Sequence, residues 1–132
     1  LKNLVAVTSQ IIGDKSDIEI NEIHHNKKKD SPSGTALSLA DSILKGGSKK
    51  IFIYREKNND RTRKKNEIGF SSIRGGDVIG EHSVFFFLDG ERIELKHIAS
   101  SRQIFSIGAL EAARWIFKKK PGLYSLMDMV EA

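Results

Sequence analysis

The stretch that decides the fold is DIEINEIHHNKKKDSPSGTALSLADSILK, residues 17–45. Its first part alternates polar and apolar residues up to Ile23, which is the period of a half-buried β-strand. After a polar segment, residues 31–35 (SPSGT) have the composition of a helix start. The pattern predicts a strand, a polar loop and a helix that ends at Gly46-Gly47. The apolar stripe of that helix comprises Ala36, Leu37, Leu39, Ala40, Ile43 and Leu44.

Before this stretch, apolar residues recur at helical spacing over residues 1–12, and Gly13 follows them. We expect a helix that ends at Gly13, because glycine tolerates the left-handed backbone common at helix ends.

After it, four runs have strand character, and a final apolar stripe has helical spacing. Asp89-Gly90 lies between two of the runs and predicts a two-residue hairpin turn. The expected strands are residues 51–54, 68–73, 84–88 and 92–98; the expected exposed loop is 55–66, and the last helix is 102–119. This order predicts an α+β fold, with a mixed β-sheet of about four to five strands covered by helices.

Composition narrows the class of protein. With 39% hydrophobic and 30% charged residues, the 132-residue chain has the make-up of a soluble globular domain. It has no cysteine, which excludes disulfides and thiolate metal sites and is compatible with a cytoplasmic location. No apolar run approaches the length of a membrane span. Residues 1–5 have neither the charged start nor the long apolar run of a signal peptide, and the first residue is not Met, so we expect the chain to be part of a longer one.

The formal net charge of +5 predicts attraction to anions, either a nucleic acid, an acidic lipid or a small acidic substrate. Residues 55–65 are strongly basic but contain no interleaved aromatics, so we favour a solvated or partner-facing loop over a nucleic-acid site.

The candidate functional residues lie at the predicted strand exit and helix start. His24 and Lys28 suit proton transfer, since an imidazole titrates near neutral pH and an ammonium group can donate a proton or stabilise negative charge. Backbone N–H groups at Gly34 and Thr35 could hold a carboxylate or phosphate. From spacing alone, a solvated basic loop before a capped helix, an anion site and a catalytic pair all remain open. Zinc is disfavoured, because His24 and His25 are adjacent and no third ligand is suitably spaced.

The pattern E-x-x-E-x-H-x-x-x-K-x-D-x-P-S-G-T-A at residues 19–36 resembles the signature of the dihydrodipicolinate reductases, enzymes of the diaminopimelate branch of lysine synthesis. The resemblance continues, in the same order, through residues 69–82, 90–97, 99–105, 108–110 and 121–128. It therefore covers nearly the whole chain.

The resemblance implies that NADPH or NADH gives a hydride to a cyclic imine that bears two carboxylates, yielding tetrahydrodipicolinate. His24 would be the proton donor or acceptor and Lys28 the second proton donor. His25 would contact the substrate, and Gly34 with Thr35 would donate backbone N–H groups to a carboxylate.

It further implies that residues 1–132 are the C-terminal substrate-binding and oligomerisation domain, assembled as a homo-oligomer, with a tetramer expected. The family's N-terminal Rossmann domain binds most of the cofactor, and we do not expect it within these residues, since Gly75, Gly76 and Gly80 do not form its glycine-rich pattern. We expect the chain alone to be inactive.

The rival hypothesis is a non-catalytic oligomerisation module whose site has decayed. His82 and His97 are expected to be structural imidazoles within strands. Arg74 and Arg102 are possible substrate or interface residues, but a surface salt bridge is the simpler interpretation, so we leave them outside the predicted site.

Overall fold

The computed structural model describes residues 1–54 and 60–131. The chain divides into two compact units, Leu1–Ile98 and Ala99–Ala132, each with its own internal contacts. The expected loop at residues 55–66 lies partly outside the described residues, and its described part, 60–66, contains no helix or strand. No helix in the described ranges combines the length and apolarity that crossing a membrane requires.

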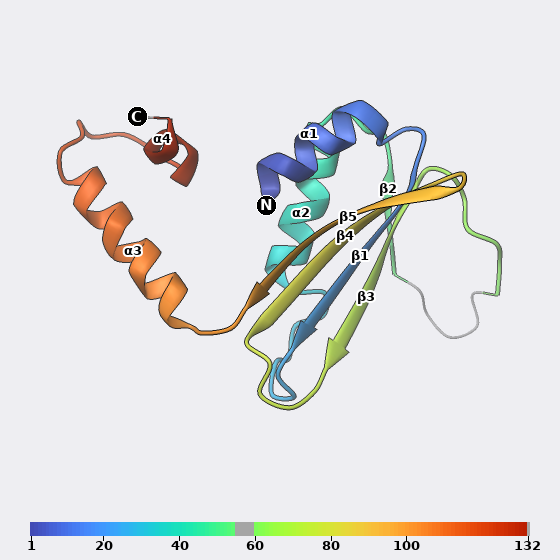
Figure 1. Cartoon of the computed structure of the whole chain (residues 1–132), viewed down its shortest axis with the longest axis horizontal. Coiled ribbons are helices and arrows are strands. Elements are labelled where there is room, and N and C mark those ends of the chain that lie inside the picture. Colours follow the sequence, from blue (N-terminus) through green and yellow to red (C-terminus); the bar gives the residue numbers. More distant parts are fainter. Residues whose placement is uncertain (55–59, 132) are drawn as a thin grey trace. The chain divides into compact units, whose positions relative to one another are not determined.

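The first unit is a five-stranded mixed sheet with two helices, so the predicted α+β class is confirmed (Figure 1). Its elements are α1 (Lys2–Ile12), β1 (Asp17–His24), α2 (Gly34–Lys45), β2 (Ile51–Tyr54), β3 (Glu67–Arg74), β4 (Gly80–Leu88) and β5 (Glu91–Ala99). The strand order is β2-β3-β1-β4-β5. β1 pairs in parallel with β3 and antiparallel with β4, and β2 pairs in parallel with β3.

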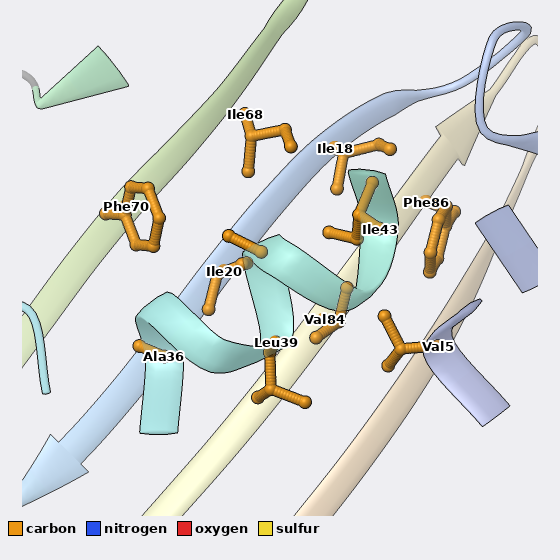
Figure 2. Close-up of a cluster of buried hydrophobic side chains, with 11 residues drawn as sticks. Val5, Ile18, Ile20, Ala36, Leu39, Ile43, Ile68, Phe70, Val84 and Phe86 are labelled. Atoms are coloured by element: carbon orange, nitrogen blue, oxygen red, sulfur yellow. The ribbon is translucent and has the colours of Figure 1, made fainter. Parts of the chain in front are cut away.

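The hydrophobic core lies on one face of the sheet, which we call the inner face. Strand register aligns the buried side chains in rows across β3, β1 and β4. α2 lies against these rows and α1 against α2, as Figure 2 shows for part of the core. The two apolar rows are Ile68, Ile18 and Phe86, then Phe70, Ile20 and Val84.

The ends of the helices follow local chemistry. Ser33 caps α2 by accepting a hydrogen bond from the amide of Ala36, and Gly47, with φ of +97°, takes the left-handed backbone just beyond the helix. The end of α1 at Gly13 is as predicted, but the left-handed conformation expected there is wrong. Gly13 keeps helical angles (φ −56°, ψ −43°), and its N–H bonds to the carbonyl of Ser9.

The largest differences from the sequence prediction concern the start of β4 and the end of the last long helix. β4 begins at Gly80 instead of residue 84; the prediction missed its first half because these residues, among them inward-facing His82, lack an apolar pattern. The Asp89-Gly90 turn is confirmed, with φ of +80° at Gly90. The last long helix ends at Ile116, a few residues earlier than expected.

The second unit contains α3 (Gln103–Ile116) and α4 (Leu126–Val130). α4 was not predicted, although Ser125 and Asp128 form a capping box at its start. Trp115 and Tyr124 pack edge to face, with ring centroids 5.4 Å apart. Neither helix has a buried residue.

Candidate functional site

The candidate site continues the inner face of the sheet beyond the apolar rows. In the next row, register places Ser72 of β3, Glu22 of β1 and His82 of β4 side by side. The last row pairs His24 with Arg74. The same alternation that buries the core residues of β1 therefore buries an acid and an imidazole at its carboxyl end.

Glu22 is the centre of this polar cluster, with a side chain that is 1% exposed. Arg74 donates to both carboxylate oxygens, at 2.7 and 2.8 Å. Burial alone would raise the pKa of Glu22, but hydrogen bonds from Arg74, Ser72 and His24 outweigh it and lower the pKa from 4.5 to about 2. Glu22 is therefore ionised at neutral pH. The hydrogen bond to Glu22 also raises the pKa of Arg74.

His24 lies at the end of β1 and is almost fully buried. Its Nδ1 is 2.5 Å from Glu22 Oε2, and its ring packs edge to face on His82 with centroids 5.0 Å apart. The position of Gly80 limits the space beside the ring, since a Cβ there would lie 3.1 Å from His24 Nε2. The imidazole is thus fixed by contacts on several sides.

His82 joins β4 to the first turn of α2. Its Nε2 lies 3.0 Å from the hydroxyl of Ser33, the residue that caps the helix. Burial, followed by the charge of His24, lowers the pKa of His82 to about 4. His82 is therefore neutral at neutral pH, as suits a structural imidazole, whereas His97 is exposed in β5.

The loop between β1 and α2 carries Lys28. Its ammonium group lies 2.8 Å from a carboxylate oxygen of Asp30, and its side chain is 22% exposed. Arg74 donates to the carbonyl of Asp30 at 2.6 Å. The segment that bears Lys28 is thus connected through Arg74 to Glu22.

The structure gives each predicted site residue a place near the carboxyl end of β1. His24 is the last residue of that strand, half-buried His25 follows it, and Lys28 lies in the next loop. Gly34 and Thr35 are exposed and form the first turn of α2, where helix geometry gives their N–H groups no partner within the helix. Among the described ranges, no group of His, Asp and Glu side chains is arranged to hold a metal ion.

Sequence reasoning assigned no role to Glu22 or Ser33, set Arg74 outside the site and treated His82 only as structural. Arg74 lies 52 residues from Glu22, and His82 lies 49 residues from Ser33, so no local pattern shows these two contacts. One signal was available. Strand alternation places Glu22 on the same buried face as Ile18 and Ile20, and a carboxylate on a buried face requires a cation.

The opposite, outer face of the sheet carries a shallow groove of about 580 Å³. Its apolar side chains include Ile73, which is 49% exposed, and Phe87, which is 37% exposed and stacks on Phe85. At one edge, Arg63 pairs with Asp17 at 2.6 Å. This groove lies on the face away from His24 and is not part of the candidate site.

Comparison with known proteins identifies the family. Residues 1–130 match the family model described as "Dihydrodipicolinate reductase, C-terminus". Among curated relatives, the 4-hydroxy-tetrahydrodipicolinate reductase of Helicobacter hepaticus is 51% identical, over 97% of this chain and 50% of its own length. The protein of the same name from Aquifex aeolicus is 47% identical, over 98% of this chain and 49% of its own length.

A solved structure described as "Dipicolinate bound Dihydrodipicolinate reductase from Paenisporosarcina sp. TG-14" is 25% identical, with a TM-score of 0.67. The alignment covers 96% of this chain and 50% of that one. The chain thus spans about half the length of the relatives it matches. It belongs to the dihydrodipicolinate reductase family and corresponds to the C-terminal part of its members.

Proposed function

We propose that this chain is the substrate-binding and subunit-associating part of a 4-hydroxy-tetrahydrodipicolinate reductase. That enzyme would reduce a cyclic imine dicarboxylate to tetrahydrodipicolinate in the diaminopimelate route to lysine, in the cytoplasm. The observation that carries the proposal is that His24 and the residue before α2, Ser33, contact the two oxygens of one carboxylate, Glu22. A proton-transfer group and an anion-binding group thus lie together in a chain whose relatives bear that name.

The substrate carboxylates would be bound by positive groups around the loop and the start of α2. The N–H groups of Gly34 and Thr35 lie at the positive end of the helix dipole. His25 and Lys28 lie in the preceding segment, and Lys28 is held by Asp30. A dianion docked here would exchange water for fixed donors, which strengthens each electrostatic interaction.

His24 would exchange the proton during reduction, and Lys28 would be the second proton donor. The imidazole is suited to this because its ring is held by Glu22 and His82, and a positioned imidazole can both donate and accept a proton. Lys28 reaches the site from a loop, so its ammonium group can change partner from Asp30 to a ligand.

The nicotinamide cofactor, NADPH or NADH, does not fit the described residues of this chain. A dinucleotide site requires a strand, a glycine-rich turn and a helix. Here Gly75 and Gly76 lie between two strands, β3 and β4, and Gly80 begins the second, so the element directly after the glycines is a strand and not a helix. We therefore assign the cofactor mainly to the half of the relatives' length that this chain does not span, and we expect the chain alone to show no turnover.

Calorimetric titration with pyridine-2,6-dicarboxylate tests the proposal. We expect weak binding by the chain and a clear loss of affinity in Lys28→Ala, whereas Lys27→Ala, an exposed neighbour in the same loop, keeps the affinity of the parent. Equal heats for Lys28→Ala and the parent would favour the rival proposal, a non-catalytic oligomerisation module. Turnover by the chain alone with either cofactor would contradict the assignment of the cofactor.

We further propose that the outer face of the sheet associates subunits into a homotetramer. α1 and α2 both lie on the inner side, and the outer side leaves Ile73 and Phe87 partly exposed. Apolar sheet faces of this kind are covered in stable proteins. Sedimentation velocity tests the idea: Phe87→Asp is expected to yield smaller species than the parent, and an unchanged mass would contradict it.

A further inference from the structure

Glu22 contacts three separate parts of the candidate site. It lies 2.5 Å from His24 Nδ1, accepts from the amide of Ser33 at 3.2 Å, and accepts twice from Arg74. The carboxylate is buried, so these protein groups take the place of water. A side chain that connects the imidazole, the start of α2 and a cation has more than a packing role.

The charge of Glu22 determines where the hydrogen on the His24 ring lies. The two hydrogen bonds from Arg74 keep the carboxylate ionised, and an ionised carboxylate can only accept hydrogen bonds. His24 Nδ1 lies within hydrogen-bond distance of it and must therefore carry the hydrogen. This holds for both the neutral and the charged imidazole, since the charged ring also has a hydrogen on Nδ1.

The consequence is that Nε2 is the only ring atom of His24 that can gain or lose a proton while the pair is intact. Nε2 is the ring atom nearest to Gly80, and a side chain at that position would crowd it, since a Cβ there would lie 3.1 Å away. Side chains on β1, β3 and β4 hold the rest of the ring: Glu22, Arg74 through Glu22, and His82.

We propose that Glu22, held by Arg74, is a positioning residue that keeps His24 in the tautomer with hydrogen on Nδ1, so that Nε2 alone exchanges the proton with substrate. A buried carboxylate has the same effect on the histidine of the serine-protease triad. The inference rests on the proposed function for the identity of the substrate, but the tautomer itself does not depend on it.

The tautomer can be measured directly on the 132-residue chain. In long-range ¹H–¹⁵N NMR spectra, with the His24 signal assigned by its loss in His24→Gln, we expect a protonated Nδ1 and an unprotonated Nε2 in the neutral ring. Free histidine favours the opposite form. An Nε2–H form of His24 in the parent chain would overturn the inference without any variant.

Variants then identify the cause. Glu22→Gln would place an amide N–H against the donors of Arg74 or Ser33 and risks unfolding the chain, so the main variant is Glu22→Leu/Arg74→Met, which removes both buried charges together. We expect its His24 signal to move to the Nε2–H form. Glu19→Gln removes a carboxylate from the outer face of the same strand and is expected to leave the signal unchanged. A persistent Nδ1–H form in the double variant would overturn the role of Glu22.

Dicarboxylate binding and the His24 tautomer are measured separately, so the two proposals can fail independently. If dicarboxylate binds but the tautomer does not respond to the Glu22 variant, the inference fails and the proposed function stands. If the tautomer responds but no dicarboxylate binds, the inference stands and the proposed function fails.

In the full-length reductase, Glu22→Leu/Arg74→Met is expected to lower kcat on the order of 10- to 100-fold, as removal of carboxylates behind metal-bound histidines does. KM is expected to change little, and an unchanged kcat would contradict the inference.

Discussion

Ser33 and His82, 49 residues apart in the sequence, share a hydrogen bond between Ser33 Oγ and His82 Nε2 at 3.0 Å. The same hydroxyl caps α2 through the amide of Ala36. One buried oxygen therefore fixes both the start of the helix and the imidazole that packs against His24. This contact connects the stability of the fold with the geometry of the candidate site.

Replacing Ser33 with alanine is expected to lower the free energy of unfolding by roughly 2 to 4 kcal/mol. Loss of the cap accounts for about 1 kcal/mol and the unsatisfied His82 for about 1–3 kcal/mol. Urea denaturation of the chain checks this. Thr35→Ala, at an exposed position in the same turn, is the control and is expected to change the value by less than about 0.5 kcal/mol. Equal stability of the two variants would contradict the shared role of the hydroxyl.

His82 gives the fold a defined pH dependence. Its pKa is lowered from 6.5 to about 4, so the folded chain binds fewer protons than the unfolded chain between these values. The contribution of His82 to stability is present above pH 6.5 and is lost as the pH falls towards 4. From this shift we expect the free energy of unfolding to fall by about 2 kcal/mol between pH 7 and pH 5. His82→Gln is expected to lack this component, and an equal slope in both chains would contradict it.

Replacing Arg74 with leucine leaves the ionised carboxylate of Glu22 buried without its cation. Breaking one side of a buried pair typically costs about 3–5 kcal/mol, and we expect a loss of this size in urea denaturation. The pKa of Glu22 would rise, because its strongest donor is gone. Adding Glu22→Leu to Arg74→Leu is expected to restore most of the lost stability. A double variant no more stable than Arg74→Leu would show that the pair does not behave as a unit.

The pair between Lys28 and Asp30 is predicted to compete with ligand binding. Asp30 is 57% exposed, and its carboxylate lies 2.8 Å from Lys28 Nζ. Asp30→Asn keeps the backbone carbonyl that Arg74 contacts but removes the competing charge. We expect about 2- to 5-fold tighter binding of pyridine-2,6-dicarboxylate, equivalent to the energy of an exposed ion pair. Asp41→Asn, exposed on α2, is the control. Weaker binding by Asp30→Asn would mean that Asp30 presents Lys28 to the ligand.

The sequence was sufficient for the elements whose determinants are local. Alternation located β1, the SPSGT segment and a glycine pair located the ends of α2, and Asp89-Gly90 located the hairpin. The start of β4 was missed because His82 interrupts the apolar pattern, and α4 because a five-residue helix has too short a stripe to show periodicity.

The candidate site also has residues that the sequence predicts and residues that only the structure reveals. His24 and Lys28 stand in a compact motif that a reader of the sequence can find. Arg74 contacts Glu22 through the pairing of β1 with β3, and His82 enters the row through the pairing of β1 with β4. Strand register is a property of the whole sheet, so the residues that support the motif became visible only once the sheet was assembled.

The position of β1 in the middle of the sheet has a consequence for motion. β1, like β3 and β4, has hydrogen-bonded neighbours on both sides, so its amides are expected to be among the slowest of the described residues to exchange with solvent. His24 and Glu22 are then expected to keep their positions when a ligand binds, and the residues that adjust to the ligand are expected to be 25–33. A rigid strand end that carries the imidazole and a loop that can adjust to the ligand are thus adjacent in the sequence.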